Sequence, residues 1–144
     1  MPLDPLGQAG ASDNPLPPSR PKTGFTSQPS EHQERELNLH DLVVKHPHAV
    51  FYFRATGVST ETVQILEGDI LIIDRVEPFS NGTLVVAIDA EEFIVRWLKR
   101  RDGRWYLVAD TEGSTPIPLE DSTLLFGVVT HILHTVPRRA WEAE

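Results

Sequence analysis

Short runs of apolar residues separated by turn residues dominate the chain from Leu37 onward. This texture is typical of a small all-β domain. Several runs are apolar on both faces, which predicts strands enclosed within a compact, curled sheet rather than wetted on one side. The pattern predicts six strands, at residues 49–55, 70–74, 83–88, 92–99, 104–109 and 124–134.

Turn residues divide these runs at 67–69, 80–82, 102–103 and 112–114. The pair Asp102-Gly103 between two runs is the strongest hairpin signal, because both residues tolerate the positive φ that a tight hairpin turn requires. Residues 37–44 fit a helical turn or two, and they fit an extended segment equally well.

The first 36 residues differ in composition from the rest. Seven of the 12 prolines lie before residue 30, and the large apolar side chains there are only Leu3, Leu6, Leu16 and Phe25. Such a segment buries too little apolar surface to offset the entropy of ordering it. We therefore expect a flexible N-terminal arm at 1–36 and a folded domain at 37–144, with no helix-turn-helix head for DNA binding.

Charge and composition narrow the function classes. The formal net charge is −8, and an acidic balance disfavours direct binding of nucleic acid, because that affinity comes from neutralising phosphates with Lys and Arg; we expect no direct sequence-specific nucleic-acid binding. The chain has no Cys, which excludes disulfides and thiol catalysis. No apolar stretch approaches a membrane span and no signal peptide is evident, so we expect a cytoplasmic protein without membrane contact.

A candidate nucleophile follows the first predicted strand. Gly57 precedes Ser59 by two residues, in a turn of small residues. A glycine there allows a sharp bend that presents the hydroxyl at a strand end, as a nucleophile requires. The tripeptide alone is a weak signal, because most such serines are ordinary turn residues.

Four blocks of sequence carry a more specific signal: FYFRATGVS, EGDILIIDR, GTLVVAIDAEEFIVRWL and LFGVVTHILH. In order and spacing they resemble the self-cleaving peptidase domain shared by LexA-type repressors and UmuD-type mutagenesis proteins. The resemblance covers about residues 23–137. It is closest to the UmuD type, given the short arm and a Gly24-Phe25 pair about 35 residues before Ser59.

The resemblance implies a small curled β-sheet, or β-clip, of the LexA and signal-peptidase type. It implies that Ser59, activated by a buried lysine, cuts the chain's own arm between Thr23 and Gly24. It further implies a homodimer that serves a UmuC-like Y-family DNA polymerase subunit and responds to a RecA filament during the SOS response. No cofactor is implied.

The lysine position of this family is occupied by Arg96, directly after Glu92-Phe93-Ile94-Val95. A serine–lysine dyad works because desolvation lets the neutral amine accept the serine proton. Guanidinium stays protonated in proteins, so Arg96 can donate hydrogen bonds but cannot serve as the general base.

The remaining lysines offer no evident replacement. The chain has only Lys22, Lys45 and Lys99. In a regular strand, Lys99 projects to the face opposite Arg96, unless a bulge intervenes. Lys45 precedes the first core strand, and nothing in the sequence brings it to Ser59.

Two further departures from the family concern cleavage. Thr23 stands where the family has a small residue before the glycine, and Thr60 stands where methionine usually follows the nucleophile. Together with Arg96 they predict a domain that has kept the fold and lost or altered the reaction.

Two other groups of residues have simpler interpretations. His131 and His134 are three apart on a strand, and His46 and His48 flank Pro47, so the spacing predicts no metal site. The basic run at 99–101, with Arg104 and nearby tryptophans, could be a nucleic-acid patch, but a solvated hairpin has the same composition, and the acidic balance of the chain favours the hairpin interpretation.

Two hypotheses follow. The favoured one is a UmuD-like accessory protein impaired in cleavage, acting through protein contacts. The alternative is an active autopeptidase in which Lys45, a histidine or water activates Ser59 while Arg96 only orients or polarises. A repressor would need a DNA-binding head, and a signal peptidase would need a membrane anchor.

Overall fold

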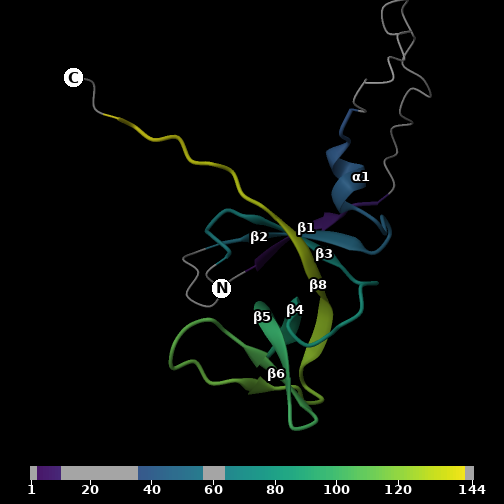
Figure 1. Ribbon diagram of the computed structural model, residues 1–144, viewed down its shortest axis with the longest axis vertical. Helices are drawn as coiled ribbons and strands as arrows, with labels where there is room; N and C mark the ends of the chain where they lie inside the picture. The colour runs from purple at the N-terminus through teal and green to yellow at the C-terminus, as the bar shows by residue number, and fades with distance from the viewer. Residues whose placement is uncertain (1–2, 11–35, 57–63, 142–144) are drawn as a thin grey trace, which may run out of the picture.

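The strands form one open, curled antiparallel sheet, a half-barrel (Figure 1). The structure is a computed structural model that describes residues 3–10, 36–56 and 64–141. Its strand order is β1-β2-β3-β8-β4-β5-β6-β7. The elements are β1 (Leu3–Gln8), α1 (Leu39–Val43), β2 (Val50–Ala55), β3 (Ile70–Asp74), β4 (Leu84–Asp89), β5 (Glu92–Arg101), β6 (Arg104–Val108), β7 (Ile117–Pro118) and β8 (Leu124–Leu133).

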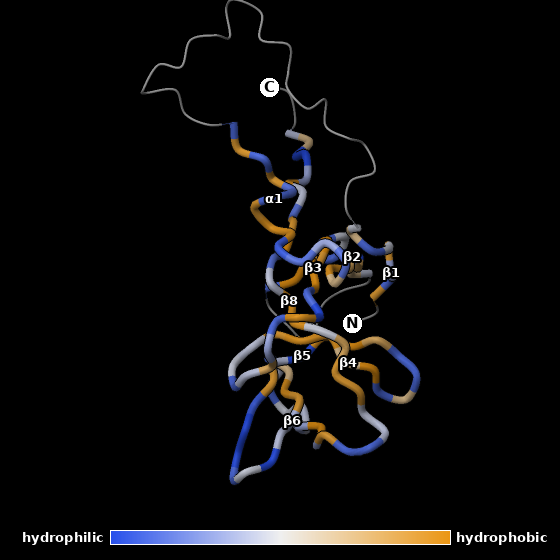
Figure 2. The backbone as a smooth tube through the Cα atoms, turned by 90° about the vertical axis from the view of Figure 1, so that its right-hand side faces the viewer, coloured by the Kyte–Doolittle hydropathy of each residue, from blue (hydrophilic) through white to orange (hydrophobic). Residues whose placement is uncertain are grey.

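The all-β prediction is confirmed, and each of the six predicted strands is present with ends that differ by at most two residues. The interior strands β3 and β4 are buried along most of their length, as expected for runs that are apolar on both faces. Figure 2 shows this pattern as hydrophobic colour along the strands and hydrophilic colour at the connecting loops. Within the described residues, no helix has the length and apolar character to cross a membrane.

The hairpin at Asp102-Gly103 is also confirmed. It joins β5 to β6, with Arg101 paired to Arg104 across the turn. Asp102 has φ 52° and Gly103 has φ 76°, the two positive values that a two-residue hairpin turn needs.

The segment that fitted either a helix or an extended chain contains the five-residue helix α1. Asn38 caps it, because its side-chain Oδ1 accepts a hydrogen bond from the Asp41 backbone N–H at 3.2 Å. Pro47 lies shortly beyond the helix, where it cannot disturb the helical hydrogen bonds.

Strand β8 joins the two ends of the sheet by pairing with β3 on one side and β4 on the other (Figure 1). Both ladders shift register along β8, as expected where a sheet bends. At this bend Gly127 lies so close to β3 that any Cβ would collide with the side chain of Ile73. Glycine therefore allows β8 to lie this close to β3.

A cluster of four phenylalanines packs inside the bend. The rings of Phe53 and Phe126 lie 5.5 Å apart, and those of Phe53 and Phe93 lie 5.0 Å apart, all edge to face. Phe51 also contacts Phe126 edge to face at 5.4 Å. Since these rings come from β2, β5 and β8, the core joins both ends of the sheet.

The sequence analysis did not predict β1, which pairs with the edge of β2. Pro5 and Gly7 weaken a strand signal, but both are tolerated on an edge strand, and a register shift lies between them. Leu3 is buried in the main core cluster. The described part of residues 1–36 thus contributes one strand to the sheet.

Candidate active site

The four predicted site residues differ in what the structure says of them. Ser59 and the Thr23-Gly24 bond lie outside the described residues. Arg96 lies in the middle of β5, paired with Val85 of β4. The roles assigned to Ser59, Thr23 and Gly24 therefore stay predictions, and Arg96 is the residue whose surroundings can be described.

Strand β5 is regular around Arg96. Its pairing with β4 from Glu92 to Trp97, and with β6 from Trp97 to Arg101, runs without a register shift. No bulge rotates Lys99 onto the face of Arg96, so the two side chains project to opposite faces. Lys99 is exposed, beside Tyr106. Lys99 therefore does not share the face of Arg96 on this strand.

The Arg96 side chain is half-buried. Its Nη1 donates a hydrogen bond to the backbone carbonyl of Val95 at 2.9 Å. A guanidinium in this position supplies positive charge and directed N–H groups, and it has no lone pair with which to accept a proton. The chemistry available to Arg96 is orientation and electrostatic stabilisation.

Described residues lie on both sides of the segment that contains Ser59, and they differ in burial. Ala55, at the end of β2, is buried, and its backbone N–H donates to the carbonyl of Asp69 at 2.8 Å. Gln64, where the description resumes, lines a hollow of about 300 Å³ together with Leu84 and Trp97. Gln64 itself is exposed, and Trp97, which follows Arg96 in β5, lines the same hollow.

Two histidine–aspartate pairs, which the sequence analysis did not predict, hold the ends of β3. His134 Nδ1 lies 2.6 Å from Oδ1 of Asp69, and His46 Nδ1 lies 2.6 Å from Oδ2 of Asp74. Both carboxylates are almost fully buried. The signal in the sequence was an aspartate at each end of the apolar run of β3, but the histidines come from distant segments.

Each buried aspartate also accepts backbone hydrogen bonds. Asp69 accepts from the N–H of Leu66 at 2.9 Å, and Asp74 accepts from the N–H of Val76 at 2.8 Å. A buried carboxylate needs such partners, because an unpaired one is strongly disfavoured. The pairs therefore anchor the turns on both sides of β3.

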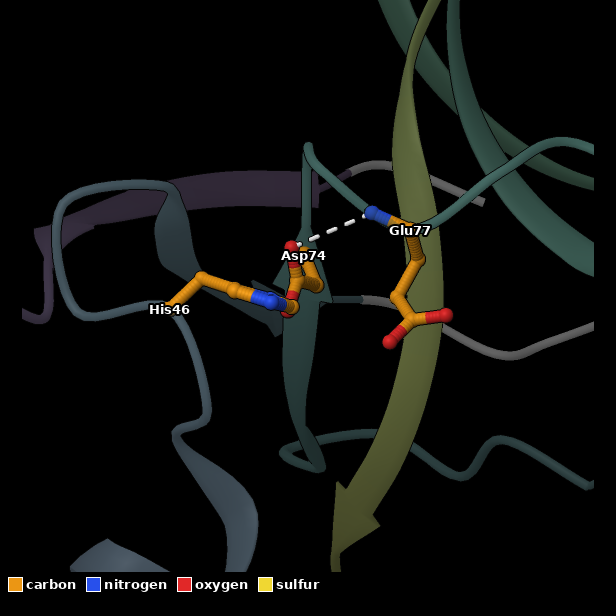
Figure 3. Close-up of side chains that lie close together, drawn as sticks. All are labelled: His46, Asp74 and Glu77. Carbon is orange, nitrogen blue, oxygen red and sulfur yellow. Dashed lines mark hydrogen bonds and ion pairs between the residues drawn. The ribbon is translucent and has the colours of Figure 1, made fainter.

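Figure 3 shows His46, Asp74 and Glu77, the one group of potential metal ligands among the described residues. Their ligand atoms lie within 4.8 Å of one another. Asp74 already has three protein partners, since the Glu77 N–H adds a third at 3.3 Å; the dashed line in Figure 3 joins Asp74 to this backbone nitrogen of Glu77. We interpret the cluster as a set of hydrogen bonds that hold the turn after β3. The expected absence of a metal site stays a prediction.

An apolar groove of about 590 Å³ lies between α1 and the sheet. The phenol of Tyr52 forms part of its wall, and burial raises the pKa of that phenol above its usual value. Leu39 and Leu42 are about half exposed at its rim. The apolar lining comprises Leu6, Leu39, Leu42, Val43, Tyr52, Ile70, Ile72, Ile132 and Leu133.

The domain is a half-barrel of eight antiparallel strands, with Arg96 in the middle of β5. Such a fold identifies a class of domain, but a fold alone does not identify an activity. The model of the family described as peptidase S24-like matches residues 15–130, and the chain belongs to that family. This confirms the resemblance to the LexA and UmuD-type proteins.

Curated relatives match over nearly the whole chain. Protein ImpA of Salmonella typhimurium is 36% identical over 135 residues, which cover 92% of this chain and 91% of ImpA. Protein MucA of Escherichia coli is 34% identical over 140 residues, with 92% and 94% covered. A LexA repressor of Shewanella loihica is 34% identical over 93 residues, which cover 65% of this chain and 45% of the repressor.

Proposed function

We propose that this chain is a UmuD-like accessory protein of SOS mutagenesis, serving error-prone translesion DNA synthesis, in which self-cleavage is impaired or absent. Similarity to ImpA and MucA over more than nine tenths of each chain supports the first part. The observation that carries the second part is Arg96, half-buried in a strand whose regular pairing keeps Lys99 on the opposite face.

The impairment has a simple physical basis. A serine hydroxyl must lose its proton to become a nucleophile, and the family's lysine receives that proton in its neutral form. Arginine has no accessible neutral form in a protein. Raising the pH, which would deprotonate a lysine, therefore leaves Arg96 unchanged.

The test is a gain of function. Arg96→Lys in the full chain is expected to introduce cleavage between Thr23 and Gly24, faster at pH 10 than at pH 7, and adding Thr23→Ala is expected to accelerate it. Mass spectrometry of the products identifies the bond. Adding Ser59→Ala should abolish the cleavage, and Arg100→Lys, the same exchange further along β5, should cause none.

The unaltered protein provides the opposite outcome. If it cuts itself rapidly at this bond and Ser59→Ala prevents the cut, another base activates Ser59. Lys45, exposed in the loop after α1, is then the first candidate to substitute. That result would establish the active autopeptidase.

The proposed partners are a second copy of the chain, a UmuC-like Y-family polymerase subunit and a RecA filament, in the cytoplasm. For the homodimer, two surfaces support the proposal. The apolar groove is open, and Val136 and Trp141 are about 80% exposed on the extended segment after β8, which leads away from the sheet (Figure 1). A second copy would cover such surface at both places.

The division into an arm at 1–36 and a domain at 37–144 remains part of this proposal. Strand β1 belongs to the arm by sequence position and to the sheet by pairing. In an Arg96→Lys variant that cleaves after Thr23, the cut would separate β1 from the remainder of the polypeptide, although β1 pairs with β2.

A further inference from the structure

The hairpin of β5 and β6 separates its basic residues between two faces. Lys99 pairs with Tyr106, and Arg101 pairs with Arg104. Cross-strand partners and residues two apart share a face. Lys99, Arg101, Arg104 and Tyr106 therefore lie on one face, which we call the basic face.

On the opposite face of the hairpin, the side chains make contacts within the chain. On this face Arg100 lies over the ring of Trp105, with the guanidinium carbon 5.5 Å from the ring centroid, and Arg96 is half-buried further along β5. Leu98 and Leu107 on this face are fully buried in a core cluster. Only the basic face presents its cations outward together.

Charge on the basic face is not compensated within the described chain. Lys99, Arg101 and Arg104 are all exposed, and the structure gives none of them an ion pair with a described carboxylate. The Arg101–Arg104 pair places like charges directly opposite each other, which destabilises a β ladder. Asp102 in the turn is the one acidic residue that lines the same hollow.

The hollow on this face has a volume of about 350 Å³. Tyr106 and Val108 of β6 line it, with Pro116 from the following loop and the cations Lys99 and Arg101. An aromatic side chain next to several cations is the combination that binds single-stranded nucleic acid, because bases stack on the ring while phosphates meet the cations.

We infer that the basic face binds single-stranded nucleic acid without sequence preference. An acidic polypeptide could pair its carboxylates with the cations, but it has no bases to stack on the ring of Tyr106. The remaining surface of a chain with net charge −8 repels phosphates, which confines contact to this patch and makes binding weak and strongly dependent on salt. The inference is independent of self-cleavage and goes beyond the proposed function.

The test uses fluorescein-labelled dT20 and the full chain, with binding followed by fluorescence anisotropy. Three phosphate contacts on a single strand give a slope of log affinity against log salt of about −2, so affinity should fall roughly twentyfold between 50 and 200 mM NaCl. Lys99→Gln/Arg101→Gln/Arg104→Gln should weaken binding at least tenfold at 50 mM. Tyr106→Leu should weaken it severalfold without changing the salt slope, because it removes stacking and no charge.

The matched control removes the same charge elsewhere. Lys45→Gln/Arg54→Gln/Arg138→Gln alters three exposed cations outside the hairpin and should leave the affinity within twofold. The triple hairpin variant should fold at least as stably as the parent, since it relieves the Arg101–Arg104 repulsion, and thermal unfolding checks this.

Three results would overturn the inference. The first is no binding of dT20 at 50 mM NaCl with protein at 100 micromolar, on the order of the weakest non-specific affinities. The second is an equal loss in both triple variants. The third is tighter binding of labelled poly-glutamate than of dT20, lost in the hairpin variant, which would identify an acidic polypeptide as the partner of this face.

Discussion

The apolar groove and the basic face are both open surfaces, but apolar side chains line the first and charged side chains form the second. The groove lies where α1 meets β1, β2, β3 and the end of β8, and most of the side chains that line it are aliphatic. The basic face lies near the other edge of the sheet, on β5 and β6, and it presents three cations. The forces that could occupy them are therefore different.

Burial of apolar surface has little dependence on salt, whereas attraction to exposed cations is screened within about 8 Å at physiological ionic strength. A partner in the groove should therefore stay bound as salt rises, and a partner on the basic face should leave. The proposed homodimer and the inferred nucleic-acid contact should therefore respond differently to salt, and a salt titration can separate them on one molecule.

The largest expected effect is on the groove. Leu42→Asp places a charge at its rim. Leu42 is about half exposed in one copy, so covering it in two symmetric grooves would contribute about 1.5–3 kcal/mol in total, and burying the two new charges adds to this loss; the dimer should weaken by about a hundredfold. Sedimentation equilibrium measures this.

Leu124→Asp is the control for the groove. Leu124 is exposed at the start of β8, outside the groove lining, and the same substitution there should leave the dimer intact. Dissociation that appears only as salt rises, in the unaltered protein, would contradict an apolar interface.

An intermediate effect is expected at the buried end of β3, next to the groove. Asp69→Asn replaces the carboxylate that holds His134 and the Leu66 N–H, and the free energy of unfolding should fall by about 2–3 kcal/mol. Urea denaturation provides the measurement.

The same Asp-to-Asn exchange in the hairpin turn should leave the stability of the protein almost unchanged. Asp102→Asn, in the exposed turn next to the basic face, yields the Asn-Gly pair that two-residue hairpins favour, so the unfolding free energy should change by less than about 0.5 kcal/mol. Equal losses at both positions would show that Asp69 contributes no more than a surface residue.

A small gain in stability is expected on the basic face alone. Arg104→Glu converts the repulsion with Arg101 into an attraction, and the protein should gain about 0.5–1 kcal/mol of stability at low salt. In 1 M NaCl, where screening acts over about 3 Å, the gain should disappear. A gain that persists at high salt would point to packing rather than charge.

The secondary structure was accessible from sequence wherever a local pattern carried the information. Alternation and apolar runs predicted β2 to β6 and β8, and Asp102-Gly103 predicted its hairpin, because these depend on neighbours in the chain. Strand β1 was missed, since Pro5 and Gly7 are compatible with a strand only at the edge of a sheet, and edge position is a tertiary property.

The candidate chemistry follows the same division. The prediction that Arg96 stands at the family's lysine position came from the sequence by itself, and guanidinium chemistry follows from the residue type alone. That Lys99 does not share the face of Arg96 needed the structure, because one bulge in β5 would have reversed its face.

Contacts between distant segments were decided by the tertiary structure alone. Nothing local links His134 to Asp69, 65 residues earlier, or joins α1 to the end of β8 around one groove. The basic run at 99–104 was visible in the sequence, but only the pairing of β5 with β6 sorted its cations onto one face beside Tyr106. A chain encodes its local preferences residue by residue, while the surfaces that meet partners arise where separate segments pack together.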